Sequence, residues 1–178
     1  MLFRSPGVTI ARIESFDNRF DRLWERCCRD YNVVAVRDSE YLNWRFFSRP
    51  DASYTVLAAS RGRDLIGYIV CRVASIDGAA WGYIVDYLVE DRSMRLFSML
   101  LQHAESYFTE SEVKGIVCTV ATAPFRGSLV RHGFYPALFR GESYVRVARN
   151  DQNPRLQAYS DLRSWFMTMA DGDLEMAF

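Results

Sequence analysis

Apolar positions in the first third of the chain follow a strand spacing and then a helical one. Residues 8–13 form a short apolar run that is typical of a β-strand. Through residues 15–30 the apolar side chains recur every three or four positions, which predicts an amphipathic helix. A second helix is expected from Asp38 to about residue 47, because Asp38 and Ser39 can cap its first turn.

Three strand-like segments come next, at residues 54–59, 65–76 and 79–89. The dipeptide Asp77-Gly78 lies between the last two segments, and it is a strong signal for a tight hairpin turn. We therefore expect an antiparallel meander in the middle of the chain.

The helical spacing returns at residues 93–108, and a short apolar strand is predicted at residues 115–120. Pro124 suits the first turn of a further helix, and Gly133 suits the left-handed position that ends it. A strand, a helix and a strand in this order predict a parallel crossover, so we expect a mixed sheet.

The rest of the pattern completes the predicted architecture. Two further strands are expected at residues 134–139 and 143–148, and residues 165–169 form the one clear apolar run near the end. The predicted fold class is α/β, of the α+β kind, with a mixed, mostly antiparallel sheet of about seven strands flanked by helices. We expect one domain over residues 1–150 and a C-terminal extension, residues 151–178, packed on the same domain.

The composition predicts a single soluble domain. The chain has 178 residues, of which 49% are apolar and 25% charged, so it can bury a sizeable core without disulfides. Lys+Arg and Asp+Glu both number 22, and this balance argues against a nucleic-acid partner. No apolar run is long enough to span a membrane, and the first residues do not read as a signal peptide.

Cysteine and histidine content narrows the chemistry further. The four cysteines form no CxxC pair, which predicts reduced thiols in a cytoplasmic protein. The two histidines lack ligand spacing and predict no metal site, and His103 is expected to be a satisfied core histidine. Aromatic residues make up 15% of the chain, so a homodimer that covers some of them is an open alternative.

Several short pieces of sequence fall in a definite order along the chain. They are Leu65-Ile-Gly-Tyr-Ile-Val, Tyr83-Ile-Val-Asp-Tyr-Leu-Val, Leu100-Leu101 and His132-Gly133-Phe134. Together with the order of the elements, they resemble the GNAT superfamily of N-acetyltransferases over residues 8–149. The segments that start at Arg37 and at Trp165 also resemble a subgroup of uncharacterised GNAT-like proteins.

The resemblance implies an acyltransferase that uses acetyl-CoA, or another acyl-CoA, as its co-substrate, with no metal. Pantetheine would insert where the fourth strand separates from the fifth, and Leu88 and Val89 would supply the backbone contacts. The pyrophosphate would lie at the start of the next helix, in a loop with the pattern Gln/Arg-x-x-Gly-x-Gly/Ala. Arg92 matches the first position of that pattern, and Ser93 and Arg95 belong to the same loop.

Other positions depart from the family pattern. Arg95 and Phe97 occupy the two small positions, so Phe97 would either crowd the phosphate or face the core. Arg92 and Arg95 would supply charge-assisted bonds in place of backbone amides, and solvated arginines are the alternative. Leu129 stands where many members place a tyrosine that protonates the leaving thiolate, and Thr122 replaces an asparagine.

Two carboxylates are candidates for the base that removes a proton from the acceptor amine. Asp86 lies in an otherwise apolar and aromatic strand, where burial would raise its pKa. The alternative for Asp86 is a strand carboxylate paired with an arginine. Glu90 follows at the strand end and would act through water, with a simple helix-start acid as the alternative.

Acceptor binding has two further groups of candidates. Arg45 and Trp44 lie on the second predicted helix, which borders the acceptor site in the family. Arg45 would bind an acceptor carboxylate or phosphate, and a structural ion pair is the alternative. Asp171 and Asp173 would attract a cationic acceptor, and a solvated acidic end is the alternative.

The function that we expect is acetyl transfer from an acyl-CoA to an amine of a small-molecule or peptide acceptor. One alternative is an acyl-carrier protein as the donor, because a carrier needs less from the altered phosphate loop. The other alternative is a GNAT-like domain without catalysis that binds a metabolite or a partner protein.

Overall fold

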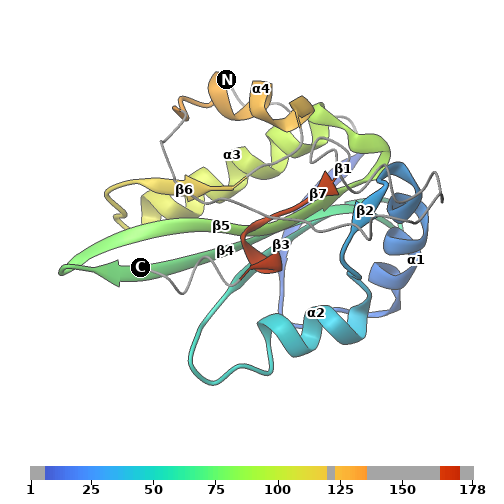
Figure 1. Ribbon diagram of the computed structural model, residues 1–178, viewed down its shortest axis with the longest axis horizontal. Coiled ribbons are helices and arrows are strands. Elements are labelled where there is room, and N and C mark those ends of the chain that lie inside the picture. The colour runs from blue at the N-terminus through green and yellow to red at the C-terminus, as the bar shows by residue number, and fades with distance from the viewer. Residues whose placement is uncertain (1–6, 120–122, 136–164, 173–178) are drawn as a thin grey trace, which may run out of the picture.

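The computed structural model describes residues 7–119, 123–135 and 165–172, and a five-stranded sheet forms its centre (Figure 1). The strand order is β1-β3-β4-β5-β6, and every neighbouring pair is antiparallel except the parallel pair β5 and β6. The predicted meander and parallel crossover are confirmed. The strands are β1 (Val8–Ile13), β3 (Thr55–Arg61), β4 (Asp64–Ile76), β5 (Ala79–Val89) and β6 (Ile116–Cys118).

The hairpin of β4 and β5 turns at Asp77 and Gly78, as predicted. Their φ angles are 50° and 75°, and Ile76 pairs with Ala79 across the turn. Two central residues with positive φ give a turn whose twist matches that of the flanking strands. The turn residues therefore fix the register of the two longest strands.

A β-bulge interrupts this hairpin toward the Val89 end of β5. Val70 pairs with Asp86, whereas the next residue, Cys71, pairs with Ile84. Val85 is therefore the extra residue on β5. A bulge of this kind bends the strand and re-aims the side chains that follow it.

The described helices cover both faces of the central sheet (Figure 1). On one face Phe20 of the first helix packs against Tyr68 of β4, with ring centroids 5.6 Å apart. On the other face Phe97 of the third helix packs against Tyr87 of β5, at 4.7 Å. The helices are α1 (Asn18–Cys27), α2 (Ser39–Phe46), α3 (Met94–Glu110) and α4 (Ala123–Arg131).

The helix ends follow the sequence signals. Asp17 and Asp38 cap α1 and α2, because their carboxylates accept hydrogen bonds from backbone N–H groups in the first turn. Ser93 caps α3 in the same way. Gly133 follows α4 with a φ of 82°, which is the left-handed conformation that the sequence predicted for it.

A second, two-stranded sheet joins distant parts of the chain. β2 (Val33–Val34) pairs in parallel with β7 (Trp165–Phe166), and a 3₁₀ turn, η4 (Met169–Asp171), follows β7. The seven strands of the described residues thus form two sheets. The strands predicted at residues 134–139 and 143–148 lie almost wholly outside the described residues.

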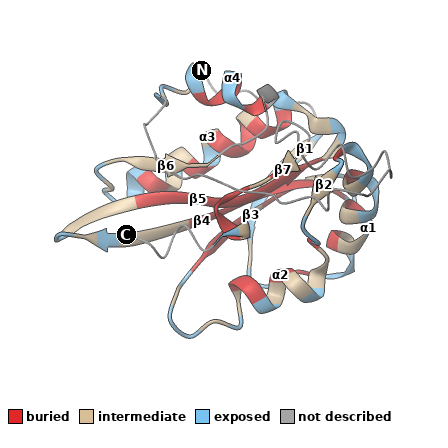
Figure 2. Cartoon of the chain, in the orientation of Figure 1, coloured by how far each residue is buried: buried red, intermediate tan, exposed pale blue. Residues whose placement is uncertain are grey.

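Buried residues concentrate on the central strands and on the inward sides of the helices (Figure 2). β5 shows this best, because every residue from Gly82 to Val89 is buried. A strand that is buried on both faces normally carries apolar residues alone. The single carboxylate in this stretch, Asp86, is therefore the feature of β5 that most needs a structural explanation.

Candidate functional site

The candidate site lies at the end of β5, beyond its described pairing with β6. Their pairing ends at Ile84 and Cys118 within the described residues, whereas β5 continues to Val89. Leu88 and Val89, the predicted pantetheine contacts, lie on this continuation and have exposed fractions of 0% and 1%. The residues that the sequence assigned to the donor arm thus lie in a buried strand end, beyond the described pairing with β6.

The loop after β5 leads directly into α3. Residues Glu90–Arg92 form a 3₁₀ turn in which Asp91 and Arg92 have positive φ angles of 54° and 48°. The Ser93 hydroxyl accepts a hydrogen bond from the Leu96 N–H at 3.3 Å. The first amides of α3 beyond these bonds have no partner inside the helix, so the helix start favours an anion.

The two arginines of the loop lie in different environments. The Arg92 guanidinium sits over the Tyr31 ring, 5.2 Å from its centroid, which is a cation–π arrangement. Arg95 is exposed to solvent at the start of α3. Phe97 faces the core and is fully buried, so it does not crowd the loop.

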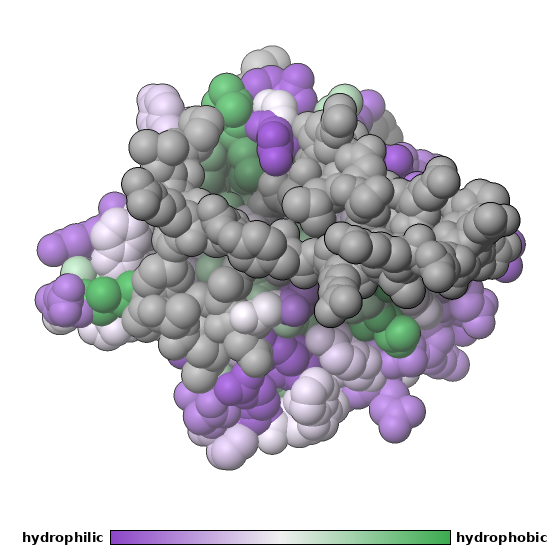
Figure 3. Space-filling view, in the orientation of Figure 1, coloured by the Kyte–Doolittle hydropathy of each residue, from purple (hydrophilic) through white to green (hydrophobic). Residues whose placement is uncertain are grey.

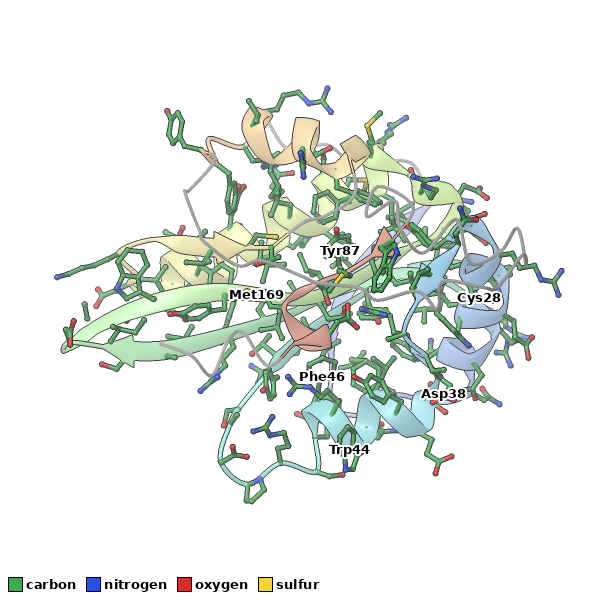
Figure 4. The ribbon with its side chains drawn as sticks, viewed as in Figure 1. Cys28, Asp38, Trp44, Phe46, Tyr87 and Met169 are labelled. Atoms are coloured by element: carbon green, nitrogen blue, oxygen red, sulfur yellow. The ribbon has the colours of Figure 1, made fainter. Side chains whose placement is uncertain are left out.

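Aromatic rings fill the interior beside this strand end. Tyr87 lies between Phe97, Phe125 and Phe166, at centroid distances of 4.7, 5.2 and 5.2 Å. Its hydroxyl group is buried and has no hydrogen-bond partner in the described part of the chain. Figure 4 shows Tyr87 near the centre of the molecule, close to Met169 of the C-terminal segment.

Asp86 occupies the opposite face of β5 and is held by three side chains. The Arg37 Nε donates to both carboxylate oxygens, at 3.1 and 3.3 Å. The Tyr68 hydroxyl donates to Oδ2 and the Thr168 hydroxyl donates to Oδ1, each at 2.8 Å. The carboxylate is 1% exposed and is therefore compensated from several sides.

A second carboxylate completes the cluster around Arg37. The Asp171 Oδ2 accepts from Arg37 Nη2 at 2.7 Å and from the Thr168 backbone N–H at 2.8 Å. Burial raises the pKa of Asp86, and Arg37 opposes that shift. The pKa of Arg37 is itself raised: burial would lower it, but the Asp86 and Asp171 carboxylates outweigh burial.

For Asp86, the arginine-paired alternative matches the structure. Its use as a general base stays a prediction, and a base of this kind would first have to leave Arg37. Glu90, the other candidate, forms an ion pair with Arg26 at 2.7 Å and keeps 24% of its side chain exposed. Of the two carboxylates, Glu90 is the one with access to water.

The acceptor candidates on α2 do not lie together. Arg45 is only 3% exposed, and its Nη1 donates to the Tyr54 hydroxyl at 3.2 Å. Trp44 is 63% exposed and points away from the sheet in Figure 4. Hydrophilic residues prevail on the surface around α2 in Figure 3. A shared role of Arg45 and Trp44 in acceptor binding stays a prediction.

Asp171 and His103 lie in other surroundings than expected. Asp171 is not a solvated end residue, because its side chain is 9% exposed and paired with Arg37. Asp173 lies outside the described residues. His103 is exposed on α3, and its Nδ1 bonds the Met99 carbonyl at 2.9 Å, so the expected core histidine was wrong.

Sequence reasoning missed most of the buried cluster. Tyr68 and Thr168 were not singled out, and Arg37 was noted only as part of a family-like segment. Their sequence separations from Asp86 follow no local period, so no spacing rule could have joined them. The one usable signal was Asp86 itself, since a carboxylate in an apolar strand requires a partner.

Three further observations on the described residues concern metal binding, membrane insertion and disulfides. No group of three or more His, Cys, Asp or Glu within them is placed to hold a metal ion. None of the described helices is long and apolar enough to cross a membrane. All four cysteines are free.

Comparison with known proteins gives a structural match only. No protein-family model and no curated protein matches the sequence. A GNAT family acetyltransferase from Staphylococcus aureus is 14% identical and has a TM-score of 0.55, over 78% of this chain and 99% of that one. A ribosomal-protein-alanine N-acetyltransferase from Brucella melitensis is 15% identical and has a TM-score of 0.57, over 79% and 99%.

A third solved structure agrees with these two. It is an aminoglycoside acetyltransferase from an uncultured soil metagenomic sample, 16% identical, with a TM-score of 0.54 over 80% of this chain and 97% of that one. At sequence identities this low, the structural similarity shows the fold alone. The chain therefore has the GNAT acetyltransferase fold, as the order of its elements predicted.

Proposed function

We propose that the protein transfers an acyl group from a phosphopantetheine thioester to an amine. The donor in the simplest case is acetyl-CoA or another acyl-CoA, and the acceptor is a small molecule or a peptide. The observation that carries the proposal is that β5 continues to Val89 beyond its described pairing with β6 and leads directly to a helix start with Arg92 and Arg95. The fold supports acyl transfer, since the solved structures that resemble it include acetyltransferases.

The chemistry requires little from side chains. A neutral amine attacks the thioester carbonyl, the oxyanion is stabilised by a donor, and the departing thiolate takes up a proton. In our proposal Glu90 removes the ammonium proton through water, because its carboxylate is partly exposed at the end of β5. Asp86 has a structural role in our proposal, because its ion pair with Arg37 holds the segment before α2 against β5.

The phosphate groups of the donor would lie at the start of α3. Arg95 is exposed there, and Arg92 lies next to the Ser93 cap. Arginine side chains bind phosphate through charge-assisted hydrogen bonds and need no close backbone approach. We also propose a cytoplasmic location, since four free thiols persist best in a reducing compartment.

A binding domain without catalysis is the second candidate. Leu129 stands at the position of the expected tyrosine and is 8% exposed, so that position supplies no proton to a thiolate. Asp86 is fully occupied by Arg37, Tyr68 and Thr168. Both observations favour a domain that keeps the fold and binds a metabolite or a partner.

Calorimetric titration with acetyl-CoA tests the donor site. We expect micromolar binding, and we expect Arg92→Ala and Arg95→Glu each to weaken it by about tenfold, as for the loss of one charge-assisted contact. Arg63→Ala is the matched control, because Arg63 is exposed in the turn between β3 and β4. The absence of binding by acetyl-CoA and by longer acyl-CoAs would remove the CoA form of the proposal.

A further inference from the structure

Four arginines and two exposed apolar residues lie in the loop before α3, in the first turn of α3 and in α4. We call this surface the α3–α4 arginine face. Arg92 precedes α3, Arg95 and Met94 lie in its first turn, and α4 adds three more residues. The α4 residues are Arg126, Val130 and Arg131.

The two helices of this face begin at the same edge of the sheet. α3 follows β5, α4 follows β6, and these strands are parallel, so both helix starts lie at their carboxyl ends. Two contacts join the helices: the Ser128 hydroxyl bonds the Met94 carbonyl at 3.5 Å, and the Phe97 and Phe125 rings are 5.0 Å apart. The face therefore lies at the carboxyl ends of β5 and β6.

Arginines outnumber carboxylates on the face. Residues 92–104 and 123–135 contain the four arginines and no aspartate or glutamate, and the exposed Asp91 directly precedes Arg92. Two neighbouring glutamates are paired, Glu90 with Arg26 and Glu105 with His132. The positive ends of two helix dipoles add to the arginine charge at the same place.

Exposed apolar residues distinguish this face from a simple phosphate site. Met94 is 45% exposed and Val130 is 60% exposed. Arg126 and Val130 are four residues apart, so they lie on the same side of α4. Figure 3 shows hydrophobic and strongly hydrophilic atoms side by side over α4, at the top of the view. Arginine and methionine are the side chains that protein interfaces favour.

We infer that the α3–α4 arginine face docks an acidic carrier protein that presents the acyl thioester on a phosphopantetheine arm. This inference rests on the proposed acyl transfer and specifies its donor. Acidic side chains of the carrier would pair with the four arginines, and its apolar residues would cover Met94 and Val130. The arm would then reach the end of β5 at Leu88 and Val89, and these buried residues would have to open to admit it.

The loop at the start of α3 fits this partner better than it fits a free nucleotide. Arg95 and Phe97 replace small residues that would let the backbone approach a pyrophosphate closely. The Ser93 hydroxyl already caps the Leu96 amide. A carrier brings a single phosphate and derives much of its affinity from its own surface, so it needs fewer backbone amides.

Binding of a bacterial acyl carrier protein, charged with an acetyl-phosphopantetheine arm, tests the docking surface. We expect calorimetry to show micromolar binding that weakens with salt and falls at least about tenfold in the double variant Arg95→Glu/Arg126→Glu. The matched control is Arg12→Glu/Arg63→Glu, which makes the same change of net charge at exposed arginines elsewhere. No binding, or equal weakening by both double variants, would overturn the inference.

Two further measurements separate docking from catalysis. Met94→Ser/Val130→Ser should weaken carrier binding about fivefold or more but leave acetyl-CoA binding unchanged, since only a protein partner covers these side chains. Thiol release with an amine present should favour the acetylated carrier over acetyl-CoA by at least about tenfold in kcat/KM. A preference for acetyl-CoA would overturn the docking proposal alone, whereas carrier binding without thiol release would overturn the catalytic proposal alone.

Discussion

Asp86 and Arg37 show how one buried charge determines the placement of several others. A carboxylate in the middle of a buried strand must be compensated, and Arg37 compensates it from a segment between β2 and α2. Arg37 in turn pairs with two carboxylates, and Thr168 donates to both: its hydroxyl to Asp86 and its backbone N–H to Asp171. The cluster thereby fixes the C-terminal segment against β5.

Removal of one partner from this cluster should be costly. We expect Arg37→Met to lower the free energy of unfolding by about 3 to 5 kcal/mol, because it leaves Asp86 buried without its counter-charge. Urea unfolding followed by circular dichroism measures the loss. The double variant Arg37→Met/Asp86→Leu should recover part of it. A single variant within about 1 kcal/mol of the wild type would contradict this account.

Buried thiols give the fold a defined response to alkaline pH. Burial raises the pKa of Cys27 from 9.0 to about 12, and burial also raises the pKa of Cys71. Above about pH 9 the unfolded chain therefore loses protons that the folded chain keeps. The protonated thiols contribute fully to the free energy of unfolding below that pH. Their contribution falls as the pH rises, by about 1.4 kcal/mol per pH unit for each thiol.

Urea unfolding under reducing conditions, repeated between about pH 8 and pH 10.5, measures this slope. Cys27→Ala/Cys71→Ala should be less stable at neutral pH because it leaves cavities. Its stability should nevertheless fall less steeply with pH than that of the wild type. Parallel curves for the two proteins would contradict burial as the cause.

At the scale of elements, the long periodic segments were predictable and the short ones were not. The β4–β5 hairpin followed from Asp77-Gly78, and α2 followed from the capping residue Asp38. β2 has only two residues, Val33–Val34, and a strand so short shows no period. Its partner β7 lies at the other end of the chain, and only tertiary structure joins them.

The close packing of β5 against α3 can be tested with a substitution at Gly82. A Cβ added at Gly82 would lie 2.7 Å from the Phe108 ring, which is closer than van der Waals contact allows. We expect Gly82→Ala to destabilise the protein by about 1 to 3 kcal/mol, as overpacking does in other cores. Thermal unfolding measures the change.

Gly127→Ala is the matched control for this substitution. Gly127 lies in α4, and a Cβ there meets nothing within 4 Å. Alanine favours a helix over glycine by about 1 kcal/mol, so we expect a small stabilisation. Equal destabilisation by both substitutions would show that contact with Phe108 is not the reason.

At the scale of the whole molecule, the sequence predicted which elements carry the candidate site residues better than it predicted their chemical roles. The order of elements placed Leu88, Val89, Arg92 and Arg95 at a strand end and a helix start, and the structure has that arrangement. The chemical roles could not follow, because they depend on which residues surround Asp86. Those partners come from three separate parts of the chain.

The whole fold also explains why acyl transfer and binding without catalysis are both candidate functions. In our proposal the end of β5 binds a thioester donor, and the α3–α4 arginine face lies at the same edge of the sheet. The C-terminal segment, held by Arg37 and Thr168, covers Asp86 on the other face of the same strand. A reaction at this strand end must therefore use groups other than a free Asp86, and Glu90 is the carboxylate we propose.

The most direct test of the central claim is thiol release from an acetyl thioester in the presence of amines. The purified protein would be given acetyl-CoA or an acetylated carrier protein, with polyamines, aminoglycosides and peptide α-amines as acceptors. Our account predicts amine-dependent thiol release that Glu90→Gln slows by about 10²-fold or more, while Arg63→Ala leaves it unchanged. No release above the uncatalysed rate with either donor and any amine would contradict acyl transfer and leave a binding domain.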